Sequence, residues 1–301
     1  MIITFLYVPH KFLNFTVGIL SLTKNNKYKL KYILYLNSIL LMFNLKLKGD
    51  KIMLLPNLNH KILFYSPFGS KNYNLNDSTS DNDIKIYVLP TFEDLYFKKE
   101  FSDSNIGKDL DYDAHDIRKL SILLWKSNIN FIETIFSMRI EKSLNQYTTD
   151  NILKIYKNRN KLAKMNLLHL WEACIGMHDN KFTNLVKGTE GTKDLVEKYG
   201  YDTKQALHCY RCLDFLQKFL DNNFNDFEDA MFYDYGNERN FMLSIKYGAY
   251  SLEKFKELAI EKRLKIEPLK NIYINQKADE ELKNWLDDLI LDIIRYNIMN
   301  I

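Results

Sequence analysis

The chain has 301 residues, 46% of them hydrophobic, which is enough to form a buried core. Its formal net charge of +4 permits a nucleic-acid partner but does not require one. The three cysteines are too few for the disulfide framework of a small secreted protein, so we predict a cytoplasmic protein.

The N-terminal residues 1–52 contain two apolar stretches. The first, 1–22, is interrupted by Pro9 and is not followed by a small-residue cleavage site. The second, 32–45, is about 14 residues long, short of the roughly 20 that a spanning helix needs. A ribosome-binding sequence could encode the residues just before Met53, so we expect translation to start there and residues 1–52 to be a misassigned extension. A pair of surface helices or a membrane anchor is the alternative. We expect no membrane partner.

Short strand and helix patterns alternate after Met53. Strands are predicted at 61–65 and 81–89, with a loop at 66–80 between them. The next predicted elements are a helical turn at 92–96, a strand at 108–115, a helix at 116–125 and a helix or strand at 131–136.

Long helical patterns dominate the C-terminal half. They cover 148–178, 203–222, 228–247, 251–263 and 276–298. The predicted fold class is therefore α/β (α+β), with a small sheet in a domain at 53–144 and an all-helical domain at 145–301.

A glycine–serine pair and two aspartates flank the loop between the first two predicted strands. Gly69 and Ser70 end one strand, where backbone N–H groups can approach a phosphate closely. Asp81 and Asp83 share one face of the next strand, because strand side chains alternate. Two neighbouring carboxylates favour Mg²⁺, so the pattern predicts metal-assisted nucleotidyl transfer. Alternatively, the aspartates are ordinary polar residues near a turn.

A third carboxylate is needed for two-metal chemistry, and a later strand offers candidates. Asp109, Asp111 and Asp113 alternate along residues 108–115 and so share a face. We predict Asp111 as the third carboxylate and Asp113 as the alternative.

Three basic residues form a stripe on the predicted helix at 203–222. Lys204, His208 and Arg211 are spaced i, i+4 and i+7, which places them on one side of a helix. Facing a cleft, they would suit a triphosphate or an acceptor backbone, since arginine can bind two oxygens at once. The alternative is a solvated cationic face.

The segment from Gly69 to Leu75, followed by Ser80 to Asp83, resembles the predicted nucleotidyltransferases of the RlaP type. These proteins of bacteria and phages belong to the DNA polymerase beta superfamily. Three further segments fit that family in order: Asp116–Leu120, Lys126–Glu133 and Tyr199–Arg211. The chain departs from the family at Asn74, where glycine is frequent, and at Ile129, where proline is frequent.

The resemblance implies a small mixed sheet flanked by helices and followed by a helical domain. It also implies transfer of an NMP from an NTP such as ATP to an acceptor hydroxyl, with release of pyrophosphate. The acceptor is unknown, and RNA is the one that the family suggests. Gly69, Ser70 and the basic stripe would contact the nucleotide. Two Mg²⁺ ions, replaceable by Mn²⁺, would be bound by three carboxylates: Asp81, Asp83 and Asp111.

Two other functions remain open. One is a regulatory nucleotidyltransferase that modifies or sequesters a protein partner, as in toxin–antitoxin or phage-defence pairs. The other is a nucleotide-binding protein without turnover.

Overall fold

The computed structural model describes residues 55–77, 80, 83–106 and 110–300. Asp81, Asp109 and the predicted extension at 1–52 therefore lie outside the described residues. Leu58–Ile301 forms one compact unit. Every helix in the described ranges is too short or too polar to cross a bilayer.

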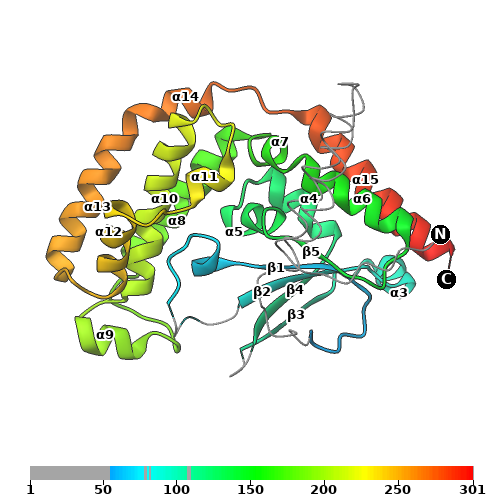
Figure 1. Ribbon diagram of the computed structural model, residues 1–301, viewed down its shortest axis with the longest axis horizontal. Helices are drawn as coiled ribbons and strands as arrows, with labels where there is room; N and C mark the ends of the chain where they lie inside the picture. The colour runs from blue at the N-terminus through cyan, green and yellow to red at the C-terminus, as the bar shows by residue number, and fades with distance from the viewer. Residues whose placement is uncertain (1–54, 78–79, 81–82, 107–109, 301) are drawn as a thin grey trace, which may run out of the picture. The chain divides into compact units, whose positions relative to one another are not determined.

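The sheet of this unit has five strands in the order β3-β4-β2-β1-β5 (Figure 1). Among the described strands only β2 and β4 pair in parallel, while β1–β2, β1–β5 and β3–β4 are antiparallel. The predicted mixed sheet is thus confirmed. The strands are β1 (Ile62–Pro67), β2 (Asp83–Val88), β3 (Ser102–Asn105), β4 (Asp111–Asp116) and β5 (Arg139–Ile140).

The two strands that flank the predicted phosphate loop lie in the middle of the sheet. In β2 every residue from Ile84 to Val88 is buried, as expected of a strand covered on both sides. Phe64 of β1 stacks on Tyr87 of β2 with ring centroids 4.5 Å apart. Figure 1 shows α4 (Arg118–Trp125) and α5 (Ile129–Ile132) over one face of the sheet. The buried core therefore holds β1 and β2 side by side up to the residues that flank the loop.

Helices follow β5 throughout the described part of the chain, which confirms the predicted helical C-terminal half. Between the strands lie α3 (Phe92–Tyr96) and a short 3₁₀ helix, η2 (Glu133–Ile135), which follows α5. The later helices are α6 (Gln146–Lys157), α7 (Arg159–Ala163), α8 (Leu167–Thr183), α9 (Lys193–Tyr199), α10 (Thr203–Asp221), α11 (Phe227–Met231), α12 (Asn237–Lys246), α13 (Leu252–Ile266), α14 (Lys270–Ile274) and α15 (Glu280–Met299). The domain boundary at 144/145 stays a prediction.

Two of the predicted long helices are interrupted. The pattern at 148–178 is divided into α6, α7 and α8, and Asn166 caps the start of α8, where its side chain accepts a hydrogen bond from the His169 N–H. The pattern at 228–247 is divided into α11 and α12. Asparagine favours helix ends because its side chain can hydrogen-bond backbone groups in place of the helical bonds. Glycine does so because ordering its flexible backbone in a helix costs more conformational entropy. The apolar periodicity alone does not reveal these breaks.

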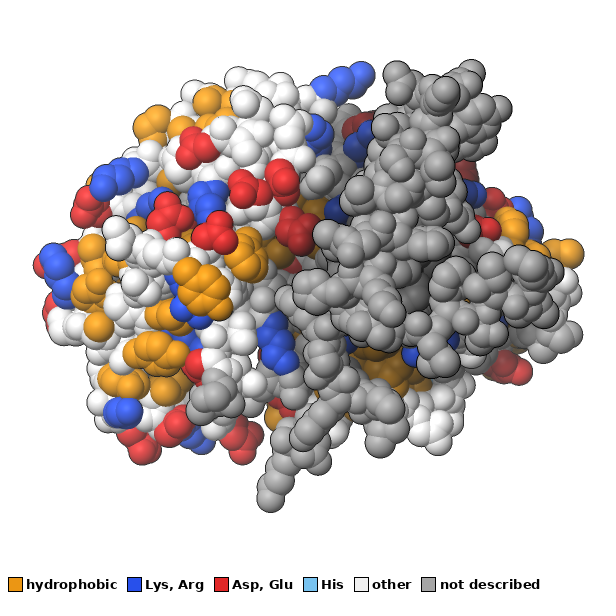
Figure 2. Space-filling view, in the orientation of Figure 1, with side chains coloured by type: hydrophobic (Ala, Val, Ile, Leu, Met, Phe, Trp, Pro, Cys, Tyr) orange, Lys and Arg blue, Asp and Glu red, His pale blue; other side chains and the backbone are white. Residues whose placement is uncertain are grey.

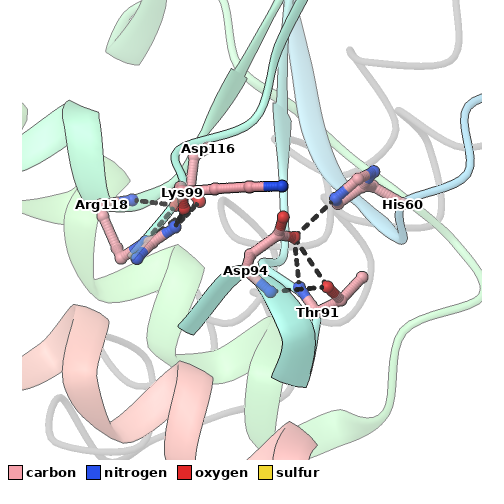
Figure 3. A network of polar contacts seen from close by, with 6 residues as sticks. All are labelled: His60, Thr91, Asp94, Lys99, Asp116 and Arg118. Atoms are coloured by element: carbon pink, nitrogen blue, oxygen red, sulfur yellow. Dashed lines mark hydrogen bonds and ion pairs between the residues drawn. The ribbon is translucent and has the colours of Figure 1, made fainter. Parts of the chain in front are cut away.

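A polar network ties the β2–β3 connection to the start of α4 (Figure 3). The fully buried Asp116 accepts hydrogen bonds from Arg118 Nε at 2.9 and 3.0 Å. Asp94 accepts from Thr91 Oγ1 at 2.8 Å and lies 2.8 Å from His60 Nε2. Asp116 ends β4 whereas Asp111 begins it, about 16 Å away along the strand. The Asp116–Leu120 segment therefore has a structural role at the opposite end of the sheet.

Candidate active site

The Gly69–Ser70 pair forms a tight bend directly after β1. Gly69 has φ +75°, a left-handed conformation that side-chain-bearing residues rarely adopt. A Cβ atom added to Gly69 would lie 3.6 Å from Asp83 Oδ2. The Phe68 N–H donates to the Asp83 carbonyl oxygen at 3.2 Å. The bend and the first residue of β2 therefore touch.

Asp83 and Asp111 are register partners on the parallel strands β2 and β4. Neighbouring strands lie about 4.8 Å apart, and paired residues project to the same face. The next pair on this face confirms the orientation, since Lys85 Nζ lies 2.6 Å from Asp113 Oδ2. The structure thus brings two of the predicted carboxylates together beside Gly69.

Asp113, the alternative third carboxylate, is held by two basic side chains. Its Oδ2 atom contacts Lys85 Nζ and lies 2.8 Å from His115 Nε2. Burial would raise the pKa of Asp113, but the contacts with His115 and Lys85 outweigh burial and hold that pKa well below its usual range. The Lys85 ammonium is itself buried and packs on the rings of Phe68 and Phe131, at 4.4 and 4.6 Å from their centroids. This arrangement favours Asp111 over Asp113 as a metal ligand.

Glu133 is a site residue that the sequence prediction missed. This carboxylate, 1% exposed, accepts hydrogen bonds at Oε2 from the Gly69 N–H and from Asn72 Nδ2, both at 3.1 Å. Burial raises its pKa to about 7, against the opposing effects of the Arg211 charge and the two hydrogen bonds. A signal was available, because Glu133 is the one charged residue between Lys126 and Arg139. Charged residues are seldom fully buried without a partner.

The three residues of the basic stripe have different environments. Lys204 is exposed, His208 is half-buried and Arg211 is 3% exposed. Burial and the charge of Arg211 lower the pKa of His208 well below its ordinary value, so we expect a neutral imidazole. The stripe is therefore not a uniform cationic face, and it is Arg211 that contacts Tyr73 in the loop after the bend.

Arg211 lies against the loop that follows the bend. Its Cζ atom is 3.4 Å from the centroid of the Tyr73 ring. Within the described residues its guanidinium makes neither a hydrogen bond nor an ion pair closer than 4 Å. Burial by itself would lower the pKa of Arg211, but the electrostatic effects of Tyr73 and of the more distant Glu133 contribute to raising it above its ordinary value. A buried guanidinium with its N–H groups unused is well suited to bind an anion.

The loop between the bend and β2 is held by the C-terminal helices. Asn74 has φ +56°, a left-handed conformation that asparagine tolerates better than most residues, which explains its place where glycine is frequent. Its side chain donates to the Tyr233 carbonyl oxygen at 2.8 Å, and its own carbonyl accepts from Arg239 Nε at 2.6 Å. Lys246 Nζ lies 2.8 Å from Asp77 Oδ2. The helical part of the chain thus fixes the loop that carries Tyr73.

The carboxylates of Asp83 and Asp111 supply oxygen ligands of the type that Mg²⁺ prefers. Within the described ranges, no group of three or more His, Cys, Asp or Glu side chains is placed to hold a metal ion. Asp81, the remaining predicted ligand, lies outside those ranges.

The raised pKa of Glu133 should make stability depend on pH. The folded chain keeps this proton up to about pH 7, whereas the unfolded chain releases it near pH 4.3. The free energy of unfolding should therefore fall by about 3 kcal/mol between pH 4 and pH 7.5, relative to that of Glu133→Gln, which cannot titrate. Urea unfolding of both proteins across this range measures the difference. If the free energy of unfolding changed equally with pH in the wild type and in Glu133→Gln, the expectation would be wrong.

A sequence model described as the RNA repair pathway DNA polymerase beta family matches residues 54–267. None of the curated proteins matches the chain. Among solved structures, a nucleotidyltransferase-like protein from Exiguobacterium sibiricum 255-15 is similar, with 11% sequence identity and a TM-score of 0.24. The match covers 79% of this chain and 69% of that protein.

Proposed function

Because the chain belongs to the RNA repair pathway DNA polymerase beta family, it is a nucleotidyltransferase, and we propose that it transfers an NMP from an NTP to an acceptor hydroxyl. One observation carries the proposal. Asp83 and Asp111 lie side by side on the only parallel pair of described strands, and Asp83 touches the left-handed Gly69 of the bend. A metal-bound triphosphate requires carboxylates beside a turn whose backbone N–H groups can reach a phosphate.

In the proposed reaction the acceptor oxygen bonds to the α-phosphorus of the NTP. The bond from that phosphorus to the bridging oxygen breaks, and pyrophosphate leaves with the electron pair. Asp111 receives the proton of the acceptor hydroxyl. Asp83 and Asp111, together with Asp81, would hold Mg²⁺, which would stabilise the negative charge of the reacting phosphates.

The phosphates have two binding partners in this proposal. Ser70 makes no hydrogen bond through its N–H or its hydroxyl with the described residues, so both groups can donate to a phosphate. Arg211 supplies the positive charge, and a charge-assisted hydrogen bond to phosphate is about twice as strong as a neutral one. Lys204 and His208 remain secondary candidates, because one is exposed and the other is adjacent to the Arg211 charge.

We propose RNA as the acceptor, because the family is described by an RNA repair pathway. The charge distribution alone does not select RNA. Figure 2 shows acidic and basic side chains interspersed over the helical half of the visible face. Recognition of the acceptor would therefore depend on contacts close to Asp111 rather than on a long-range field.

Labelled NTPs test the proposal directly. The full chain is incubated with Mg²⁺, with each of four α-³²P-labelled NTPs in turn and with either an RNA pool or a protein pool. We expect label in the RNA pool, release of pyrophosphate, and loss of both when Mg²⁺ is chelated. Label in the protein pool alone would refute the RNA acceptor, and transfer that survives Asp83→Asn would refute the proposed metal site.

A further inference from the structure

The residues around η2 lie directly against the end of β1 and the bend. Ser66 Oγ donates to the Thr134 carbonyl oxygen at 2.7 Å, and Ser137 Oγ donates to the Pro67 carbonyl oxygen at 2.6 Å. Glu133 ends the Lys126–Glu133 segment, one of the segments that resemble the family. The segment from Glu133 to Ser137 thus acts as a support for the end of β1 that leads into the bend.

Within this support, Glu133 makes the contact that reaches the bend itself. Its Oε2 atom binds both the Gly69 N–H and Asn72 Nδ2, so one oxygen joins the two ends of the turn around Ser70. The Asn72 N–H completes the turn by donating to the Gly69 carbonyl oxygen at 3.0 Å. Glu133 therefore occupies the N–H of Gly69 and leaves the N–H and hydroxyl of Ser70 for a ligand.

The burial of Glu133 is costly, which argues that the carboxylate has a specific task. Arg211, Lys85 and Tyr73 are the titratable groups near it, and they come from α10, β2 and the loop after the bend. The Lys85 ammonium is engaged by Asp113, and Arg211 is farther than 4 Å away. An apolar side chain at position 133 would avoid the desolvation penalty but could not accept the two hydrogen bonds.

We propose that Glu133 is a positioning residue that holds the Gly69–Asn72 turn in the geometry in which Ser70 binds the triphosphate of the NTP. This inference rests on the proposed function of the same site. The role requires an acceptor oxygen at this position, and glutamine supplies one in the same place. Charge is not required, so Glu133→Gln should preserve what Glu133→Ala removes.

Steady-state kinetics of three variants test the proposal. Glu133→Ala should raise the KM for the NTP at least tenfold with kcat changed less than threefold, because a displaced turn weakens phosphate binding. Glu133→Gln should keep the KM within about threefold of the wild type. Tyr87→Phe is the matched control, because it removes another buried hydrogen bond to the same support, the 3.0 Å contact with Thr134 Oγ1. It should lower the midpoint of urea unfolding without changing the KM.

Two results would overturn the positioning role. An unchanged KM in Glu133→Ala would show that the turn does not need this contact, and a raised KM in Glu133→Gln equal to that of Glu133→Ala would show that charge, not an acceptor, is required. Both results presuppose an active wild type, so they leave the proposed function standing. A wild-type chain that neither binds nor turns over any NTP would refute both proposals together.

Discussion

Replacing Asp111 with asparagine should lower the rate of nucleotidyl transfer about a thousandfold or more, while the chain stays folded. Asp111 is the register partner of Asp83 and lies at the first position of β4. Asparagine has the same shape but lacks the negative charge that, in the proposed mechanism, would bind Mg²⁺ and accept the acceptor's proton. Single-turnover transfer of labelled NMP measures the rate, and urea unfolding measures the stability.

Asp113→Asn is the matched control, because the same change is made two residues further along the same face of β4. It leaves the buried Lys85 ammonium without its carboxylate, which lies 2.6 Å away in the wild type. We expect a loss of about 2 to 3 kcal/mol in the free energy of unfolding, less than for a fully buried pair because the Asp113 side chain is 34% exposed. The rate per folded molecule should fall less than about tenfold. If the two variants lose rate equally, Asp113 shares the role assigned to Asp111.

Local sequence patterns predicted most strands of the sheet and which aspartates share a face of a strand. The apolar run from Ile84 to Val88 and the alternation of Asp111 with Asp113 follow directly from the period of a strand. The edge strand β3 has the sequence Ser-Asp-Ser-Asn and four exposed residues, so no apolar pattern marks it. The position of β3 depends on its pairing with β4, and the sequence of β3 alone does not indicate that pairing.

The long-range contacts of the site could not be predicted in the same way. Lys85 and Asp113 meet because β2 and β4 are parallel and in a particular register, and register depends on the whole sheet. Glu133 meets Gly69 across a separation of 64 residues. The helix that carries the basic stripe was predicted correctly, since α10 covers Thr203–Asp221. Periodicity cannot predict which member of the stripe is buried, however, because α8, α11, α12 and α13 all pack on this helix.

Replacing Arg211 with methionine should change stability and nucleotide binding in opposite directions. The guanidinium is 3% exposed, stacks on Tyr73 and has no hydrogen bond or close ion pair with the described residues. Methionine has a similar length and no charge to desolvate, so the free energy of unfolding should rise by about 1 kcal/mol. The KM for the NTP should rise about a hundredfold, because two charge-assisted hydrogen bonds to phosphate are lost. Urea unfolding and steady-state kinetics measure the two effects.

Two further variants separate phosphate binding from general electrostatics. Lys204→Met removes an exposed positive charge from the same helix and should change the KM less than about threefold. Arg211→Lys keeps the charge but loses the planar pair of N–H donors, so its KM should lie between those of the wild type and Arg211→Met. A loss of stability in Arg211→Met with an unchanged KM would show that the arginine serves the core through Tyr73. The opposite signs predicted here are what distinguish a buried cation kept for a ligand from one kept for the fold, since only the former leaves a more stable protein when it is removed.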